Sequence, residues 1–185
     1  TASGCAPLPG WEQVTERKGL RWIVLGELHG TVETPALLLD ALCHTVAART
    51  VAVALEMPVN EQAGLDAYLA SDGGSAARAA FLRQPSWQMP QKDGRSGTAQ
   101  FALVERLRVL RQRGRLAKVF AFAPAFEMSD VLNPEAYERR MAETLSRGSP
   151  DGATVLVLVG NYHAMRKRAG ESGPLPMAAH LPQDQ

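Results

Sequence analysis

Four apolar runs divide the 185-residue chain, and each is short enough to form a β-strand. They cover residues 20–25, 50–56, 117–123 and 153–159. The run at 50–56 is continuously apolar rather than alternating, which is typical of a strand covered on both faces of a sheet. We therefore predict a central sheet built from these runs.

Segments with helical periodicity lie between the apolar runs. The predicted helices cover residues 34–49, 60–70, 75–82, 98–113 and 133–148. Thr34, Asn60 and Asn133 are the expected N-caps, because their side-chain oxygens can accept from free backbone N–H groups. Strands that alternate with helices predict an α/β fold with a mainly parallel sheet and helices on both faces. In such folds the site lies at the carboxyl ends of the strands.

The same pattern predicts the domain organisation. We expect an irregular N-terminal segment over residues 1–19 and a single α/β domain over residues 20–185. A hydrophobic content of 45% supplies the core of one domain. Residues 84–97 lack periodicity, and so long a loop inside a compact domain is usually functional. The segment after His163 is expected to be loop, with at most a short strand.

Composition and charge narrow the class of protein. The net charge is +1, so no nucleic-acid footprint is indicated. No apolar run approaches the roughly 20 residues that cross a membrane. The expected partner is therefore a small-molecule or peptide substrate.

The first residues suggest an exported chain. The opening TASGCAPLPG is small and polar, and Ala2-Ser3-Gly4-Cys5 resembles a lipoprotein cleavage box. We expect a periplasmic protein or a lipoprotein anchored at Cys5, with a plain flexible terminus as the alternative. Cys5 and Cys43 can instead pair in an oxidising compartment, or Cys43 can be a small buried side chain of a helix.

Titratable residues follow three of the apolar runs. Gly26 ends the first run and is followed by Glu27 and His29. The last run ends in the same way at Gly160, which His163 follows with the same Gly-x-x-His spacing, and Glu56 ends the second run. We expect these strand ends to converge on one site.

The residue types at these ends allow two kinds of chemistry. Two histidines with carboxylates (His29, His163, Glu27 and Glu56) are a common ligand set for a divalent transition metal. Without a metal, a histidine oriented by a carboxylate can take a proton from water as a general base. Both possibilities predict a catalytic role for the same residues.

Other candidates surround these residues in the sequence. Arg95 can bind a substrate anion or a developing oxyanion, or it can form a loop salt bridge with Asp93. Trp87 can line the substrate pocket or anchor the loop. Asn161 and Tyr162, next to His163, can donate hydrogen bonds to a substrate or pack within their own loop.

These motifs resemble a known superfamily. GELHG after one strand, ALEMP after the next and GNYH after a late strand are similar to segments of erythromycin esterases, ChaN-type haem-binding lipoproteins and TraB/Tiki proteins. The resemblance covers most of residues 20–165. Glu27 and Glu56 match acidic positions of the esterase-like pattern, and the two Gly-x-x-His units match the Tiki-like motifs.

The branches of this superfamily imply different activities. The esterase-like branch implies a metal-free hydrolase that uses histidine and glutamate, here Glu27, His29, Glu56 and His163. We expect Arg95 to act with these catalytic residues, on the substrate side. The Tiki-like branch implies peptide hydrolysis with Mn, Co, Zn or Fe at the histidines and glutamates. The ChaN-like branch implies haem or iron binding without catalysis, with Tyr162 or Tyr68 as an iron ligand. We expect an exported hydrolase of an ester or amide bond, with the haem-binding protein as the alternative.

Overall fold

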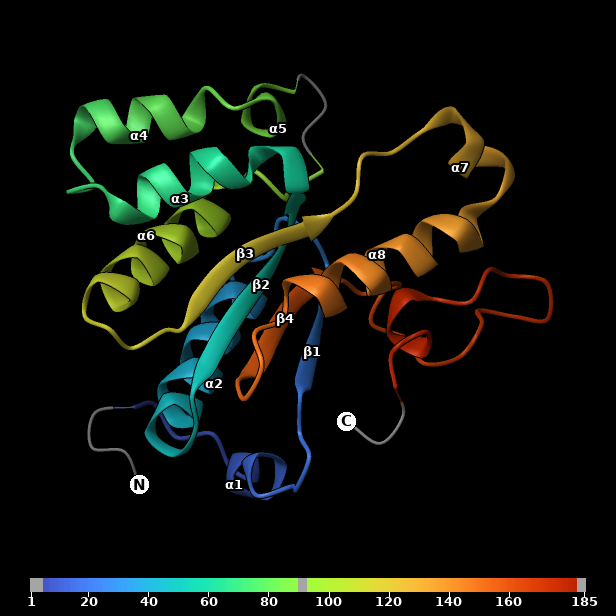
Figure 1. Ribbon diagram of the computed structural model, residues 1–185, viewed down its shortest axis with the longest axis horizontal. Helices are drawn as coiled ribbons and strands as arrows, with labels where there is room; N and C mark the ends of the chain where they lie inside the picture. The colour runs from blue at the N-terminus through green and yellow to red at the C-terminus, as the bar shows by residue number, and fades with distance from the viewer. Residues whose placement is uncertain (1–4, 90–92, 183–185) are drawn as a thin grey trace.

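A four-stranded parallel sheet lies at the centre of the protein (Figure 1). The structure, a computed structural model, describes residues 5–89 and 93–182. The strands are β1 (Trp22–Glu27), β2 (Val51–Pro58), β3 (Lys118–Ala123) and β4 (Thr154–Gly160). They lie in the order β1-β4-β2-β3, so the last strand of the chain is inserted between the first two. This confirms the α/β fold with a parallel sheet.

The strand order determines which face each helix covers. From β1 to β2 and from β2 to β3 the chain moves across the sheet in one direction. From β3 to β4 it moves back, and a right-handed crossover then places the connecting helix on the opposite face. This reversal gives the sheet its two covered faces.

One face of the sheet carries most of the helices. They are α2 (Glu33–Ala48), η1 (Val59–Glu61), α3 (Gln62–Ala70), α4 (Ser75–Leu82), α5 (Pro85–Gln88) and α6 (Thr98–Gln112). Leu38 and Leu42 of α2 and Leu103 and Leu107 of α6 are fully buried against this side. Tyr68 and Phe81 stack within the same cluster, with ring centroids 4.9 Å apart.

The opposite face is covered by α8 (Pro134–Gly148) and by the tail. Met141 and Leu145 of α8 pack on Phe120 and Phe122 of β3. Met177, in the short helix η2 (Met177–Ala179), is buried in the same cluster. The tail therefore belongs to the core, where the sequence indicated only loop.

The predicted strands and long helices are confirmed, while several local details differ. The helix α7 (Met128–Leu132) lies where the sequence predicted no helix. A capping box between Glu127 and Asp130 stabilises its N-terminus. Asn133 caps α8 as predicted. Thr34 and Asn60 are not caps, because Thr34 lies inside the first turn of α2 and Asn60 inside η1.

The N-terminal segment is attached to α2 rather than irregular throughout. It contains the helix α1 (Trp11–Thr15), and Trp11 Nε1 donates to Thr45 Oγ1 of α2 at 3.0 Å. A disulfide joins Cys5 to Cys43. The disulfide uses the Cys5 sulfur that a lipid anchor at this residue would need. The other residues of the proposed cleavage box, Ala2, Ser3 and Gly4, lie outside the described residues. No helix in the described part of the chain is long and apolar enough to cross a membrane.

Candidate active site

The carboxyl ends of three neighbouring strands bring the predicted residues together. Glu27 ends β1 and pairs in register with Gly160 at the end of β4. Glu56 lies near the end of β2, where the pairing with β3 shifts between Leu55 and Pro58. Its Oε2 accepts a hydrogen bond from the Gly160 N–H at 2.6 Å. The inserted strand β4 therefore links the two glutamates.

His29 forms the first histidine–carboxylate pair. Its Nδ1 lies 2.8 Å from Oε1 of Glu27, and its Nε2 lies 3.7 Å from Oε2 of Glu56. The hydrogen bond to Glu27 is the largest cause that raises the pKa of His29 above its usual 6.5, with burial opposing it and the Glu56 charge adding to it. A histidine with a raised pKa is a stronger base when it is neutral.

His163 forms a second pair with a residue that the sequence did not suggest. Its Nδ1 lies 2.8 Å from the carboxylate of Glu138 on α8, and its Nε2 lies 3.8 Å from Oε1 of Glu56. Glu138 also accepts the backbone N–H of Met177 at 2.7 Å. Both imidazoles are thus held through Nδ1 by a buried glutamate and direct Nε2 toward Glu56.

Glycine 160 leaves room for this arrangement. A Cβ atom at this position would lie 2.8 Å from Nε2 of His29 and 3.4 Å from Oε2 of Glu56. Any side chain there would displace the imidazole from its present place. The Gly-x-x-His unit therefore has a steric reason as well as a hydrogen-bonding one.

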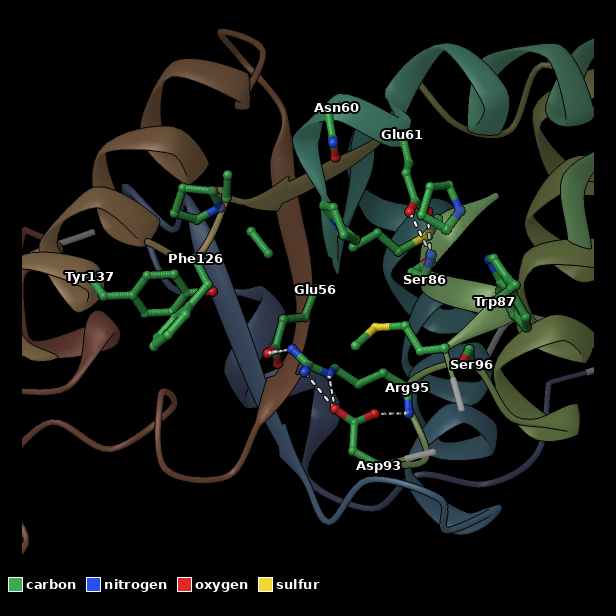
Figure 2. A pocket seen from close by; sticks show the side chains of 17 residues that line it. Glu56, Asn60, Glu61, Ser86, Trp87, Asp93, Arg95, Ser96, Phe126 and Tyr137 are labelled. Atoms are coloured by element: carbon green, nitrogen blue, oxygen red, sulfur yellow. Dashed lines mark hydrogen bonds and ion pairs between the residues drawn. The ribbon is translucent and has the colours of Figure 1, made fainter. Parts of the chain in front are cut away.

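Arg95 enters the site from the loop between α5 and α6. Figure 2 shows its guanidinium between Glu56 and Asp93. One terminal nitrogen donates to Oε1 of Glu56 at 2.8 Å, and Nε donates to Oδ2 of Asp93 at 2.8 Å. The loop salt bridge predicted as one alternative for Arg95 is therefore present, and Arg95 also reaches the central carboxylate. Its binding of a substrate anion stays a prediction.

A close backbone contact fixes the Arg95 loop on the first histidine pair. Gly94 has φ +100°, a conformation that favours glycine. A Cβ on Gly94 would lie 2.2 Å from the backbone nitrogen of Gly30 and 2.5 Å from the carbonyl carbon of His29. Only a glycine can let the loop approach this closely, so Gly94 places Arg95.

A cavity of 370 Å³ adjoins Glu56, Asp93 and Arg95. Trp87, predicted as a pocket residue, lies in its wall. Tyr137 of α8 lies on the other side of Glu56 in Figure 2, and its ring centroid is 6.4 Å from that of His163. Burial and the charge of Glu56 raise the pKa of Tyr137 to about 12, so its hydroxyl keeps its proton at neutral pH.

Three predicted residues have other surroundings. Tyr68 is buried between α3 and α6 and donates to Oε2 of Glu105 at 2.6 Å. The Tyr162 hydroxyl donates to the carbonyl oxygen of Pro174 at 2.7 Å. Asn161 donates its backbone N–H to the Glu27 carbonyl at 2.8 Å. Both tyrosine hydroxyls therefore bond to other groups in this structure, while the ring centroid of Tyr162 lies 5.7 Å from that of His163. The haem-ligand hypothesis stays a prediction.

Glu138 and Tyr137 were absent from the sequence prediction. Glu138 lies on the same face of α8 as the buried residues Met141, Ala142 and Leu145, because helical spacing separates it from them. A carboxylate on the apolar stripe of an amphipathic helix is a signal that it has a buried partner. This pattern identifies Glu138 as a residue with a buried partner, but it does not identify His163 as that partner.

The donors around Glu56 match a metal site only in part. Each Nε2 points inward and each Nδ1 is held by a carboxylate, as in many metal-binding histidines. However, Arg95 and the Gly160 N–H already occupy the two oxygens of Glu56. Within residues 5–89 and 93–182, no group of three or more His, Cys, Asp or Glu side chains is arranged to hold a metal ion. A divalent metal bound by Glu56 would have to displace Arg95 or the Gly160 N–H from it, whereas proton transfer needs no such change.

Solved structures share this fold at low sequence identity, although no family model and no curated protein matches the sequence. A mutant of the erythromycin esterase EreC in its open conformation has a TM-score of 0.63 and 13% identity, over 88% of this chain and 67% of that one. The type III effector HopBA1 has a TM-score of 0.56 and 19% identity, over 84% of this chain and 74% of that one.

A third similar structure is RRSP, a MARTX toxin effector domain from Vibrio vulnificus. Its TM-score is 0.56 at 19% identity, over 95% of this chain but only 35% of that one. At such identities the likeness shows a distant relationship of fold, which includes erythromycin esterase but does not assign a family. The part of the resemblance that concerns erythromycin esterases is thus supported at the level of the fold. The ChaN-like and TraB/Tiki-like parts stay predictions.

Proposed function

We propose that the protein is a hydrolase that cleaves an ester or amide bond with a water molecule activated by His29. The observation that carries the proposal is the convergence of two Nε2 atoms on Glu56, at 3.7 and 3.8 Å. These gaps are too long for direct hydrogen bonds and suit a bridging water. The shared fold with an erythromycin esterase supports hydrolysis as the class of reaction.

In the proposed reaction His29 is the general base. Its Nε2 takes a proton from the water, and the water oxygen bonds to the carbonyl carbon of the substrate. Glu27 holds Nδ1 at 2.8 Å and stabilises the imidazolium that forms. Glu56 orients the water between the two rings.

The remaining residues act on the tetrahedral intermediate. Arg95 keeps N–H groups beyond those used by Glu56 and Asp93, and these stabilise the oxyanion. His163, held by Glu138, gives a proton to the leaving oxygen or nitrogen as the bond to the carbonyl carbon breaks. The products are a carboxylic acid and an alcohol or amine, so the reaction consumes one water.

A metal-dependent hydrolase is the second candidate. The Nδ1–carboxylate pairs favour it, because metal-binding histidines are usually oriented in this way. The contact between Arg95 and Glu56 opposes it. Metal content therefore belongs in the first experiment.

The test measures hydrolysis of a panel of para-nitrophenyl esters and para-nitroanilides. His29→Asn is expected to lower kcat/KM by about 10²–10⁴-fold, the range for loss of a general base. His44→Asn is the matched control, because His44 is a half-buried histidine of α2 outside the site, and its Nε2 bonds to the Ala6 carbonyl. Elemental analysis accompanies both variants, on protein purified without a histidine tag or chelator.

The results separate the candidates. Metal-free wild type with the expected loss supports the proposal. If wild type contains a stoichiometric metal and the His29→Asn, His163→Asn double variant does not, metal-dependent hydrolysis replaces the metal-free reaction as the proposed function. Full activity of that double variant would exclude both.

We also propose export to an oxidising compartment, where a disulfide such as Cys5–Cys43 persists. Thiol titration of the unfolded protein tests the pairing. No free thiol before reduction and two after it are expected, and two before reduction would contradict the pairing.

A further inference from the structure

The cavity beside the histidine cluster is walled mainly by apolar groups. The apolar or aromatic residues that line it are Met57, Pro58, Pro85, Trp87, Met89, Ala123, Pro124, Ala125, Phe126 and Tyr137. In Figure 2, Phe126 and Tyr137 lie on one side of Glu56 and Trp87 on the other. These walls come from the end of β2, from α5, from the loop after β3 and from α8. The cavity therefore lies between helices that cover opposite faces of the sheet.

The charged groups at the cavity are already engaged with one another. Arg95 is paired with Glu56 and Asp93. The carboxylate of Glu61 accepts from both the backbone N–H and the hydroxyl of Ser86. Because each of these charges already has a partner in the protein, the apolar walls favour an uncharged apolar group as the ligand.

The size of the cavity limits the group that fills it. Its volume of 370 Å³ is more than twice the volume of about 150 Å³ that holds a benzene molecule in an engineered protein cavity. It lies within the range of about 300–1,000 Å³ that is typical of small-molecule sites. A group larger than a single benzene ring therefore fits.

The position of the cavity relates it to the reacting bond. Glu56 and Arg95 line the cavity and also contact or face the histidine cluster. A group in the cavity thus lies next to the place where the proposed water attacks. Resting on the proposed function, we infer that the cavity binds the acyl group of the substrate, and that this group is uncharged, apolar and larger than a benzene ring.

The experiment compares para-nitrophenyl esters that differ only in the acyl group. Naphthylacetate is expected to be cleaved with a kcat/KM at least about tenfold above acetate, because an aromatic group leaves water on binding. The succinate monoester, which carries a charge, is expected to be a poorer substrate than butyrate. Equal rates for all esters, or a preference for succinate, would overturn the inference.

Matched variants locate the effect in the cavity. Met89 lines it, whereas Met128 is exposed on α7 and does not. Met89→Ala is expected to lower the ratio of kcat/KM for naphthylacetate to kcat/KM for acetate about fivefold, and Met128→Ala is expected to leave both values unchanged. The same loss in both variants, or in neither, would contradict the assignment.

A binding measurement separates this inference from the proposed function. Naphthylacetamide is uncharged, and its binding is measured by calorimetry on the full chain carrying His29→Asn, with and without Met89→Ala, so that turnover is suppressed. If wild type hydrolyses no ester but Met89→Ala weakens binding of the amide about fivefold, the cavity assignment stands and the hydrolase proposal fails. If esters are hydrolysed but the amide does not bind and acyl size has no effect, the inference fails alone.

Discussion

The two histidine–carboxylate pairs have the same geometry and different origins. In both, Nδ1 lies 2.8 Å from a glutamate oxygen and Nε2 faces Glu56. Glu27 and His29 are two residues apart at the end of one strand, whereas Glu138 and His163 are 25 residues apart, on a helix and a loop. One pair is therefore a product of local sequence and the other of tertiary packing.

The pairs also differ in what covers them. The Arg95 loop packs on the first pair through Gly94 and Gly30. The tail packs on the second, where Met177 donates to Glu138 and Ala178 donates to the His163 carbonyl at 2.9 Å. The two pairs are thus held in place by separate parts of the chain, and each of these parts can be altered by itself.

The largest effect is expected when both imidazoles are removed. His29→Asn and His163→Asn should each lower kcat/KM by about 10²–10⁴-fold. If the pairs act as one unit, the double variant should be no more than about tenfold below the worse single variant, because groups that act together are not additive. Steady-state kinetics on the three variants measures this, and an unaffected His163→Asn would show that only the first pair functions.

A smaller effect is expected from the support of the first pair. Gly94→Ala forces the loop away from His29 and Gly30 and should displace Arg95, lowering kcat by about 10²–10³-fold, as when an oxyanion donor is lost. Gly97→Ala is the control, because its Cβ would meet only the Gly94 carbonyl oxygen at 3.3 Å. Equal activities of the two variants would count against a catalytic role of Arg95.

Loss of the contact between the tail and the second histidine pair should lower the free energy of unfolding. Glu138→Ala leaves the buried Met177 N–H without its acceptor, which should lower the free energy of unfolding by about 1–3 kcal/mol. Glu27→Ala should cost less, because the Nδ1 that it releases belongs to a partly exposed imidazole. Urea denaturation compares the two, and the reverse order would contradict this view of the tail.

The smallest effect is a shift of the pH profile. His29 must be neutral to act as a base, so kcat/KM should fall as the pH drops through its pKa, which lies above 6.5. Glu27→Gln removes the main cause that raises this pKa and should move the acid limb to lower pH. Glu138→Gln should leave the limb in place. A limb that moves only in Glu138→Gln would identify His163 as the base.

Much of the fold was predictable, because burial imposes a periodicity on the sequence. The four apolar runs became the four strands, and Asn133 capped α8 as expected. The short helices α1, α5 and α7 were not predicted, since helices of this length show too few positions for a period. The tail is mostly irregular, as predicted, but the burial of Met177, Ala178 and Leu181 was not predicted, because these residues lie outside any periodic pattern.

The site was predictable where its residues follow strands. Glu27, His29, Glu56 and His163 were identified because the carboxyl ends of parallel strands meet at one edge. Tyr68 was chosen by resemblance alone, and its hydroxyl bonds to Glu105 instead. Arg95 was named with two alternative roles that the sequence could not rank.

The sequence by itself determined the strands, the residues at their ends and the first histidine pair, because these depend on neighbours along the chain. Only the tertiary structure decided that β4 lies between β1 and β2, that Glu138 holds His163 and that Gly94 brings Arg95 to Glu56. These contacts join segments 25 to 133 residues apart. No local pattern records such a pairing, because its free energy comes from packing the folded chain.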